Sequence, residues 1–195
     1  MSRLVVSVLT SLDGYFQGPE GDLGVMPFED AFNTHNLELL RSAGTLVYGS
    51  TWFTENWDFW SEVAADPSAD AREHDIARFV TTLPSIVISD SMAAEPDAPW
   101  ARSTRIIPRA SAPAELARLK EEGGGGGDLV MFGSATTWNP LLERGLVDEL
   151  IVLVGAALLG TGNKLYAGPR TGLRLADARI LPGSELVRIR YLTTG

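Results

Sequence analysis

Four small residues, Gly133-Ser134-Ala135-Thr136, separate an apolar run that predicts a buried strand, Leu129–Phe132, from a segment with helical apolar spacing that extends to Arg144. A second apolar run, Leu150–Val154, follows, so the order is strand, small-residue turn, helix, strand. Backbone N–H groups at the start of such a helix, and its positive end, can bind a phosphate. Small residues also mark many ordinary tight turns. The pattern therefore indicates a nucleotide cofactor, with a plain turn as the alternative.

One carboxylate stands where it could take part in catalysis. Asp13 precedes Gly14, directly after an apolar run at residues 3–10 that predicts the first strand. A carboxylate in such a loop can orient a substrate hydroxyl or amine, or relay a proton. An Asp-Gly pair also forms turns without any catalytic role. The other prominent acidic pair, Asp148-Glu149, is expected to cap or pair locally.

Aromatic and histidine residues indicate less specific chemistry. The stretch Trp52–Trp60 holds five aromatic residues, more than one helix face buries, so some are expected to line a cleft or an interface. His35 and His74 are the only histidines, and neither has a second ligand at metal-binding spacing. We expect both on helix surfaces and no metal site. No Ser-His-Asp order or nucleophile elbow supports a hydrolase.

The composition predicts one soluble domain. The chain has 195 residues, 45% of them hydrophobic and 21% charged, which fits a single globular domain over residues 1–195. Its net charge of −9 argues against binding to nucleic acid or to an anionic membrane. The absence of cysteine excludes disulfides and thiolate chemistry and suits a cytoplasmic location. The apolar N-terminal run is too short for a signal peptide or a membrane span.

Strands and helices are predicted to alternate, which favours an α/β sheet with helices on both faces. The five glycines at 123–127 predict a flexible connection within the domain. A glycine-rich loop, Ser11–Gly24, is expected after the first strand. The predicted strands are residues 3–10, 45–48, 86–89, 105–107, 129–132 and 150–154, with a strand pair in 174–192. The predicted helices are 30–41, 70–80 and 111–122, with a further helix after the turn at 133–136 that extends to residue 144.

Six motifs together resemble the dihydrofolate reductase-like fold, and more narrowly the group related to the C-terminal reductase domain of the bifunctional riboflavin-biosynthesis deaminase/reductase. Their order and spacing cover nearly the whole chain. The motifs are Ser11-Leu12-Asp13-Gly14-Tyr15, Leu46-Val47-Tyr48-Gly49, Pro84-Ser85-Ile86-Val87-Ile88-Ser89, Phe132-Gly133-Ser134-Ala135-Thr136, Gly145-Leu146-Val147-Asp148-Glu149-Leu150, and Leu158–Tyr166.

The resemblance implies a three-layer αβα architecture, with a mostly parallel central sheet, antiparallel C-terminal strands, and NADPH across the carboxyl ends of the strands. It implies an adenosine phosphate contact at Gly49-Ser50-Thr51 and a contact to the adenosine side at Ser89. The pyrophosphate would lie on Gly133-Ser134-Ala135-Thr136. The loop after the first strand, with Asp13, Gly14, Phe16 and Gln17, would face the nicotinamide and the substrate. Members of this fold group often dimerise, so a homodimer is expected.

Two departures bear on the cofactor. Neutral Ser50 and Thr51 stand where the family often has a basic residue, and Asp90 stands where it often has a basic or hydroxyl residue. A carboxylate repels a 2′-phosphate but can accept a hydrogen bond from a free ribose hydroxyl. NADPH is expected, NADH stays possible, and Arg102 or Arg105 is a candidate for a compensating cation.

The resemblance implies a pyridine-nucleotide-dependent reductase that passes a hydride to a small heterocyclic substrate, similar to 5-amino-6-(5-phosphoribosylamino)uracil reductase or dihydrofolate reductase. Water or Asp13 is expected to supply the proton. Glu29, Asp30 and Asn33 lie where true dihydrofolate reductases carry a helix carboxylate, but none matches securely, so dihydrofolate is not predicted. No deaminase domain is expected, because its zinc site needs cysteine. The alternatives are a non-catalytic ligand-binding protein that keeps the fold and a purely structural oligomer.

Overall fold

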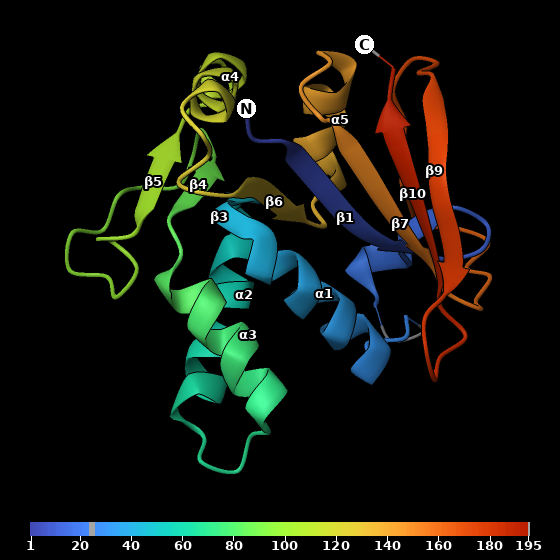
Figure 1. The fold of residues 1–195 in the computed structure, drawn as a ribbon, viewed down its shortest axis with the longest axis horizontal. Coiled ribbons are helices and arrows are strands. Elements are labelled where there is room, and N and C mark those ends of the chain that lie inside the picture. The colour runs from blue at the N-terminus through green and yellow to red at the C-terminus, as the bar shows by residue number, and fades with distance from the viewer. Residues whose placement is uncertain (24–25, 195) are drawn as a thin grey trace.

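The computed structural model describes residues 1–23 and 26–194 (Figure 1), so Gly24, expected at the end of the first loop, lies outside the described residues. The predicted strands and helices are present, with ends that differ by a few residues. The strands are β1 (Leu4–Thr10), β2 (Tyr15–Gln17), β3 (Ala43–Gly49), β4 (Ser85–Ile88), β5 (Thr104–Ile107), β6 (Asp128–Phe132), β7 (Glu149–Val154), β8 (Asn163–Lys164), β9 (Leu173–Ile180) and β10 (Val187–Thr193). The helices are α1 (Asp30–Ser42), α2 (Ser50–Ala65), α3 (Ala71–Thr82), α4 (Ala112–Glu121) and α5 (Ala135–Glu143).

The main sheet has eight strands in the order β5-β4-β3-β6-β1-β7-β10-β9. Strand β1 lies in its interior and pairs in parallel with β6, where Leu4 is opposite Leu129, and with β7, where Val5 is opposite Glu149. Strands β3, β4 and β5 continue the parallel arrangement on one side. On the other side β10 runs antiparallel to β7, and β9 antiparallel to β10. The mostly parallel sheet with antiparallel C-terminal strands is confirmed.

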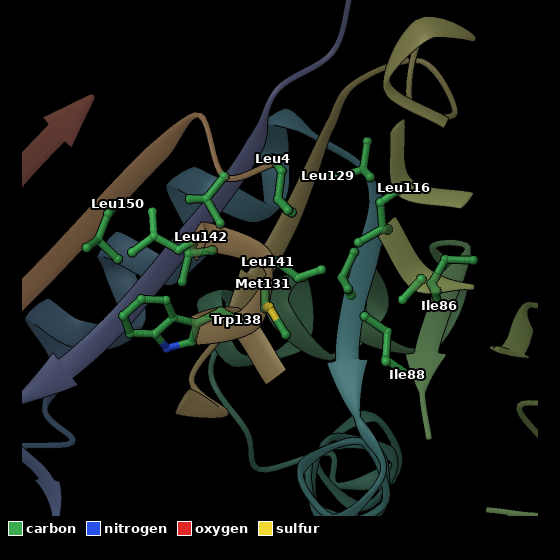
Figure 2. Packing of buried hydrophobic residues seen from close by; sticks show 14 of the residues in the cluster. Leu4, Ile86, Ile88, Leu116, Leu129, Met131, Trp138, Leu141, Leu142 and Leu150 are labelled. Carbon is green, nitrogen blue, oxygen red and sulfur yellow. The ribbon is translucent and has the colours of Figure 1, made fainter. Parts of the chain in front are cut away.

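Helices cover both faces of this sheet and give the predicted three-layer αβα architecture (Figure 1). Helices α4 and α5 cover one face, where Leu116 and Trp138 pack with Leu4 and Leu129 of the sheet (Figure 2). Helices α1, α2 and α3 cover the other, with Leu40 among the buried side chains. Parallel strands buried on both faces are nearly all apolar, which is why the sequence predicts them well.

The aromatic stretch Trp52–Trp60 lies within α2. Phe53 is 2% exposed, and its ring lies 5.5 Å from that of Tyr48 and 5.4 Å from that of Trp100, measured between centroids. Phe59, in contrast, is 57% exposed. The aromatic residues are therefore divided between the core and the surface, as their number requires.

The five glycines form a packed turn in place of the flexible connection that the composition predicts. A Cβ on Gly44 of β3 would lie 2.3 Å from the Gly124 carbonyl oxygen and 2.5 Å from the Gly127 nitrogen. The Thr45 hydroxyl donates to the same Gly124 oxygen at 3.1 Å. Residues 123–126 all have φ between +59° and +96°, which glycine adopts without strain. The glycines thus allow a close backbone approach at the amino end of β3.

His35 differs from its predicted surface position. It is 2% exposed, and its Nε2 lies 3.2 Å from the hydroxyl of Ser7 on β1. Burial, with smaller effects from the positive charges of Arg188, Arg179 and Arg190, lowers the pKa of His35 to about 4. Helix α1 presents this histidine to the sheet, so it is neutral in the folded protein at neutral pH.

No helix in the described part of the chain is long and apolar enough to cross a membrane.

Candidate functional site

The carboxyl ends of the parallel strands meet along one edge of the sheet, and the predicted site residues lie there in two groups. One group follows β3, β4 and β6, which are neighbours in the sheet. It contains Gly49-Ser50-Thr51, Ser89, Asp90 and Gly133–Thr136. The other follows β1 and contains Asp13, Gly14 and Gln17. Open α/β sheets bind ligands at this edge.

The turns after β3 and β6 touch at Gly49. A Cβ there would lie 2.6 Å from the Thr137 hydroxyl oxygen and 2.8 Å from the Ser134 hydroxyl oxygen, and those hydroxyls are 2.8 Å apart. Gly133 and Ser134 both have positive φ, +64° and +54°, which turns the chain sharply into α5. Only glycine fits at position 49 without displacing Ser134 and Thr137.

Two helices begin at this contact. Helix α2 starts after Gly49 and α5 after Ser134, and within the described chain neither start is capped by a side-chain hydrogen bond. The first backbone N–H groups of each helix therefore keep their donor capacity, and both positive helix ends lie at the same edge. This arrangement suits a ligand with more than one negative charge, such as a pyrophosphate.

The indole of Trp52 adds a donor beside the same turn. Its Nε1 is buried and has no hydrogen-bond partner among the described residues. It lies 3.9 Å from the position of a Cβ on Gly133. Buried donors without partners are rare in folded proteins and often belong to ligand sites. The sequence shows the aromatic stretch, but no residue pattern singles out Trp52 within it.

Asp90 has a cationic neighbour that the sequence analysis missed. Its Oδ1 accepts a hydrogen bond from the Arg109 backbone N–H at 2.9 Å, and its Oδ2 is 3.8 Å from the Arg109 Nε. Arg105, one of the two expected compensating cations, instead pairs with Glu115 at 3.1 Å. Arg102 precedes β5 and so lies toward the opposite edge of the sheet. Arg109 comes two residues after β5 ends. Because β4 and β5 are parallel neighbours, residues that follow them lie at the same edge of the sheet, and this rule would have placed Arg109 near Asp90.

Ser89, at the end of β4, is 5% exposed and stabilises the turn that follows it. Its hydroxyl oxygen accepts from the backbone N–H of Ser91 at 3.2 Å and of Met92 at 3.0 Å. The Ser89 hydroxyl also lies 3.5 Å from the Ser91 hydroxyl, and either of the two could be the donor. The adenosine contact implied by the resemblance stays a prediction.

Asp13 ties two loops together. Its carboxylate accepts from the Ser11 hydroxyl at 2.6 Å, from the Leu159 N–H at 3.1 Å and from the Gly160 N–H at 2.7 Å. These hydrogen bonds, the one from Ser11 first, lower the pKa of Asp13 to about 2. The group is ionised at neutral pH and has no proton to donate. An orienting role for Asp13 stays a prediction, while proton donation from it is disfavoured.

Gly14 and Gln17 belong to the same pair of loops. Gly14 has φ +85° and accepts a backbone hydrogen bond from Leu165 at 2.9 Å. Gln17, on β2, pairs with β8, and its side-chain oxygen accepts from the Asn163 amide at 3.1 Å. These contacts place the two residues in the segment that folds over the end of β1. Their cofactor contacts stay predictions.

A cavity of about 130 Å³ lies near the end of β7, lined by Pro27, Glu29, Ala156, Glu185 and Leu186. Of the two carboxylates considered at the start of α1, Glu29 lines this cavity, together with Glu185, and it also accepts a hydrogen bond from the Ser184 hydroxyl. Asp30 is instead paired with Arg72 at 2.7 Å.

Two exposed leucines accompany the loops that Asp13 joins. Leu12 is 68% exposed and Leu158 is 73% exposed, and the Leu12 N–H donates to the Ala157 carbonyl at 2.8 Å. Exposed apolar side chains on such loops are suited to contact a flat ring. A larger apolar cavity of about 380 Å³, between α5, β7 and β10, contains none of the predicted site residues.

The remaining charged candidates have structural roles. Asp148 pairs with Lys120 at 2.6 Å, and Glu149 pairs with Arg3 at 2.9 Å and Arg190 at 2.6 Å. The two residues have structural partners, as expected, but these partners are distant in the sequence, so the expected local pairing is wrong. In the described residues, no group of three or more histidines or carboxylates is arranged to hold a metal ion.

Comparison with known proteins agrees with this geometry. The model of the RibD C-terminal domain family matches residues 3–187. The protein YyaP of Bacillus subtilis is 22% identical over 197 residues, covering 99% of this chain and 96% of its own.

Solved structures share the fold. A putative riboflavin biosynthesis protein from Shewanella sp. PV-4 superposes with a TM-score of 0.71 at 19% identity, over 99% of both chains. The diaminohydroxyphosphoribosylaminopyrimidine deaminase/5-amino-6-(5-phosphoribosylamino)uracil reductase of Thermotoga maritima superposes with a TM-score of 0.68 at 10% identity. That match covers 99% of this chain and 57% of the Thermotoga chain.

Proposed function

The chain belongs to the RibD C-terminal domain family, whose members include reductases of the riboflavin-pathway type, and we propose that it transfers a hydride from NADPH to a small heterocyclic substrate. A pyrimidine related to 5-amino-6-(5-phosphoribosylamino)uracil is the first candidate substrate, because the Thermotoga relative carries that reductase activity in its name.

The observation that supports this proposal most directly is the contact between the turns after β3 and β6. Gly49 lets the hydroxyls of Ser134 and Thr137 approach the turn after β3 closely. Within the described residues, two helix starts there have no side-chain cap, and the buried Trp52 indole has no hydrogen-bond partner. These features fit a dinucleotide whose pyrophosphate lies on Ser134 and whose adenosine end extends toward Ser89. When bound, the cofactor supplies the hydride.

The reacting half of the site would lie at the loops after β1 and β7. Asp13 fixes these loops relative to each other through Leu159 and Gly160, and exposed Leu12 and Leu158 offer apolar contacts to a substrate ring. Since Asp13 is ionised, we propose that water supplies the proton that accompanies the hydride.

A second candidate function is a non-catalytic nucleotide-binding protein that keeps the fold. It is favoured by one observation, the carboxylate of Asp90 at the adenosine end, where a negative charge opposes a 2′-phosphate. We also propose a homodimer, as expected from the resemblance. The molar mass in solution, measured by light scattering, tests the homodimer.

The test of function has two stages. Purified protein is titrated with NADPH and with NADH, following tryptophan quenching, and Gly49→Ala serves as the site variant. The loaded protein is then mixed with the phosphoribosylaminouracil, and nicotinamide absorbance is followed. Binding with substrate-dependent oxidation supports the reductase. Binding without oxidation of any pyrimidine or pteridine tried favours the non-catalytic alternative, and binding of neither nucleotide contradicts both.

A further inference from the structure

We infer that Asp90 and Arg109 together select the 2′ substituent of the cofactor, Arg109 favouring a phosphate and Asp90 favouring a free hydroxyl. The inference rests on the proposed function, because it assumes that a pyridine dinucleotide lies along this edge. It goes further by assigning opposite effects to two neighbouring residues. The protein is expected to accept both NADPH and NADH, with a preference that one substitution can shift in either direction.

Asp90 and Arg109 occupy neighbouring positions at one edge of the sheet. Asp90 follows β4 and Arg109 follows β5, and these strands pair in parallel at the edge of the sheet, with Ile88 opposite Ile107. The hydrogen bond from the Arg109 N–H to the Asp90 carboxylate, 2.9 Å long, joins the two loops. Both side chains therefore start from fixed backbone positions beside buried Ser89, on the adenosine side of the predicted cofactor path.

The Arg109 side chain extends to the start of α5. The Arg109 Nη1 is 3.5 Å from the carbonyl oxygen of Thr136, in the first turn of α5. The side chain thus extends from the β5 end toward the helix start that is expected to hold the pyrophosphate. A guanidinium presents several donors in one plane and binds phosphate in a bidentate manner. Arg109 is placed to meet a phosphate between the turn after β4 and the start of α5.

The Arg109 guanidinium is available to a ligand. The Asp90–Arg109 ion pair is 3.8 Å long, and the side chains are 60% and 48% exposed. Exposed pairs of this kind contribute little stability, so the guanidinium can turn from the carboxylate to a ligand at small cost. The backbone hydrogen bond to Asp90 does not depend on that side-chain position.

Asp90 and Arg109 have opposite effects on the binding of a 2′-phosphate. Near Asp90 a ribose hydroxyl can donate a hydrogen bond to the carboxylate, whereas a 2′-phosphate is repelled by it. Near Arg109 the phosphate gains charge-assisted hydrogen bonds, and a hydroxyl gains little. With NADPH the two residues therefore oppose each other, and with NADH Asp90 is favourable on its own.

Three variants test the selection. Arg109→Gln removes the cation. Asp90→Asn removes the negative charge and keeps an oxygen that can accept the Arg109 N–H. Arg105→Gln is the matched control, since it removes an equal charge from β5, the strand that precedes Arg109, where Arg105 pairs with Glu115 away from this edge. Each variant is titrated with NADPH and NADH, following tryptophan quenching, which requires no substrate.

We expect Arg109→Gln to weaken NADPH binding by about 10–100-fold, since hydrogen bonds to charged groups are worth about 1.5–3 kcal/mol and each tenfold is about 1.4 kcal/mol. Its NADH affinity should change by less than about threefold, as expected for a residue that contacts the phosphate alone. Asp90→Asn should tighten NADPH about 3–10-fold, from removal of a screened charge at close range, and weaken NADH. Arg109→Lys should recover part of the NADPH affinity, and Arg105→Gln should match the original protein.

Equal loss of both nucleotides in Arg109→Gln, or no change in the NADPH to NADH ratio in Asp90→Asn, would overturn the selection while leaving the reductase proposal intact. If the unsubstituted protein binds neither nucleotide, the proposed function fails first and the selection fails with it. Far-ultraviolet circular dichroism of each variant separates altered recognition from misfolding.

Discussion

The buried histidine on α1 makes the stability of this protein depend on pH in a range where few other groups titrate. His35 has an ordinary pKa of 6.5 and a folded pKa of about 4, because burial disfavours its charged form and three arginines add to the effect. As the pH falls below 6.5, the unfolded chain therefore takes up a proton that the folded protein does not. The stabilisation is complete above the unfolded pKa and is lost as the pH falls toward 4.

The size of the effect follows from the two pKa values of His35. At about pH 5 this histidine is almost wholly protonated in the unfolded chain and still mostly neutral in the folded protein. Linkage then gives a loss of about 2 kcal/mol in the free energy of unfolding between about pH 8 and pH 5. Carboxylates with lowered pKa values, such as Asp13, lose their contribution mainly below this range, because their ordinary pKa is 3.8.

The assay is urea unfolding, followed by tryptophan fluorescence at several pH values and at constant protein concentration, for the original protein and for His35→Gln. Glutamine keeps a polar atom near the Ser7 hydroxyl, 3.2 Å from the histidine Nε2, but does not titrate. We expect the original protein to lose about 2 kcal/mol more than the variant between pH 8 and pH 5. Parallel pH curves for the two proteins would refute the reasoning.

Three further perturbations test packing and loop contacts. Gly49→Ala should lower NADPH affinity at least about tenfold, because the added Cβ displaces the side chains of Ser134 and Thr137. Little stability should be lost, since both of these are side chains and not backbone. Unchanged NADPH affinity would mean that this contact between the two turns does not shape the cofactor site. Gly44→Ala places its Cβ against backbone atoms of the glycine turn, so urea unfolding should show a loss of about 1–3 kcal/mol; a loss under about 0.5 kcal/mol would mean that the turn moves freely. Asp13→Asn should speed hydrogen exchange at the Leu159 and Gly160 amides, which then lose a charged acceptor, while exchange in β1 stays unchanged; equal rates would show that these amides are held by other contacts.

The sequence was most informative where one physical effect dominated. Strands such as β1 and β6 have side chains buried on both faces, so runs of mainly apolar residues identified them, and the order of motifs indicated the fold. The acidic pair Asp148-Glu149 was also interpreted correctly as structural, although its partners are distant in the sequence and not local as its position after a helix end had implied.

Contacts between segments far apart in the sequence were harder to predict. The glycines at 123–127 have a composition typical of flexible linkers, and only the close tertiary contacts reveal why Gly124, Gly125 and Gly127 must be small. The burial of His35 likewise depends on which face α1 turns toward β1, and helical periodicity did not separate it from a surface position. Arg109 is further from Asp90 in the sequence than Arg102 and Arg105 are. It is close in space because β4 and β5 are neighbouring parallel strands that end at the same edge of the sheet.

The interior position of β1 has a consequence for how the protein is made. Strand β1 must wait for partners at residues 128–132 and 149–154, which are synthesised much later, before its edges are paired. Until residues 149–154 have been synthesised, the apolar strand Leu4–Thr10 lacks one of its partners and is open to aggregation or chaperone binding. Long-range parallel pairing of this kind is also slow to form. Expression yield should therefore respond to temperature and to chaperone supply, more than to changes at the cofactor edge.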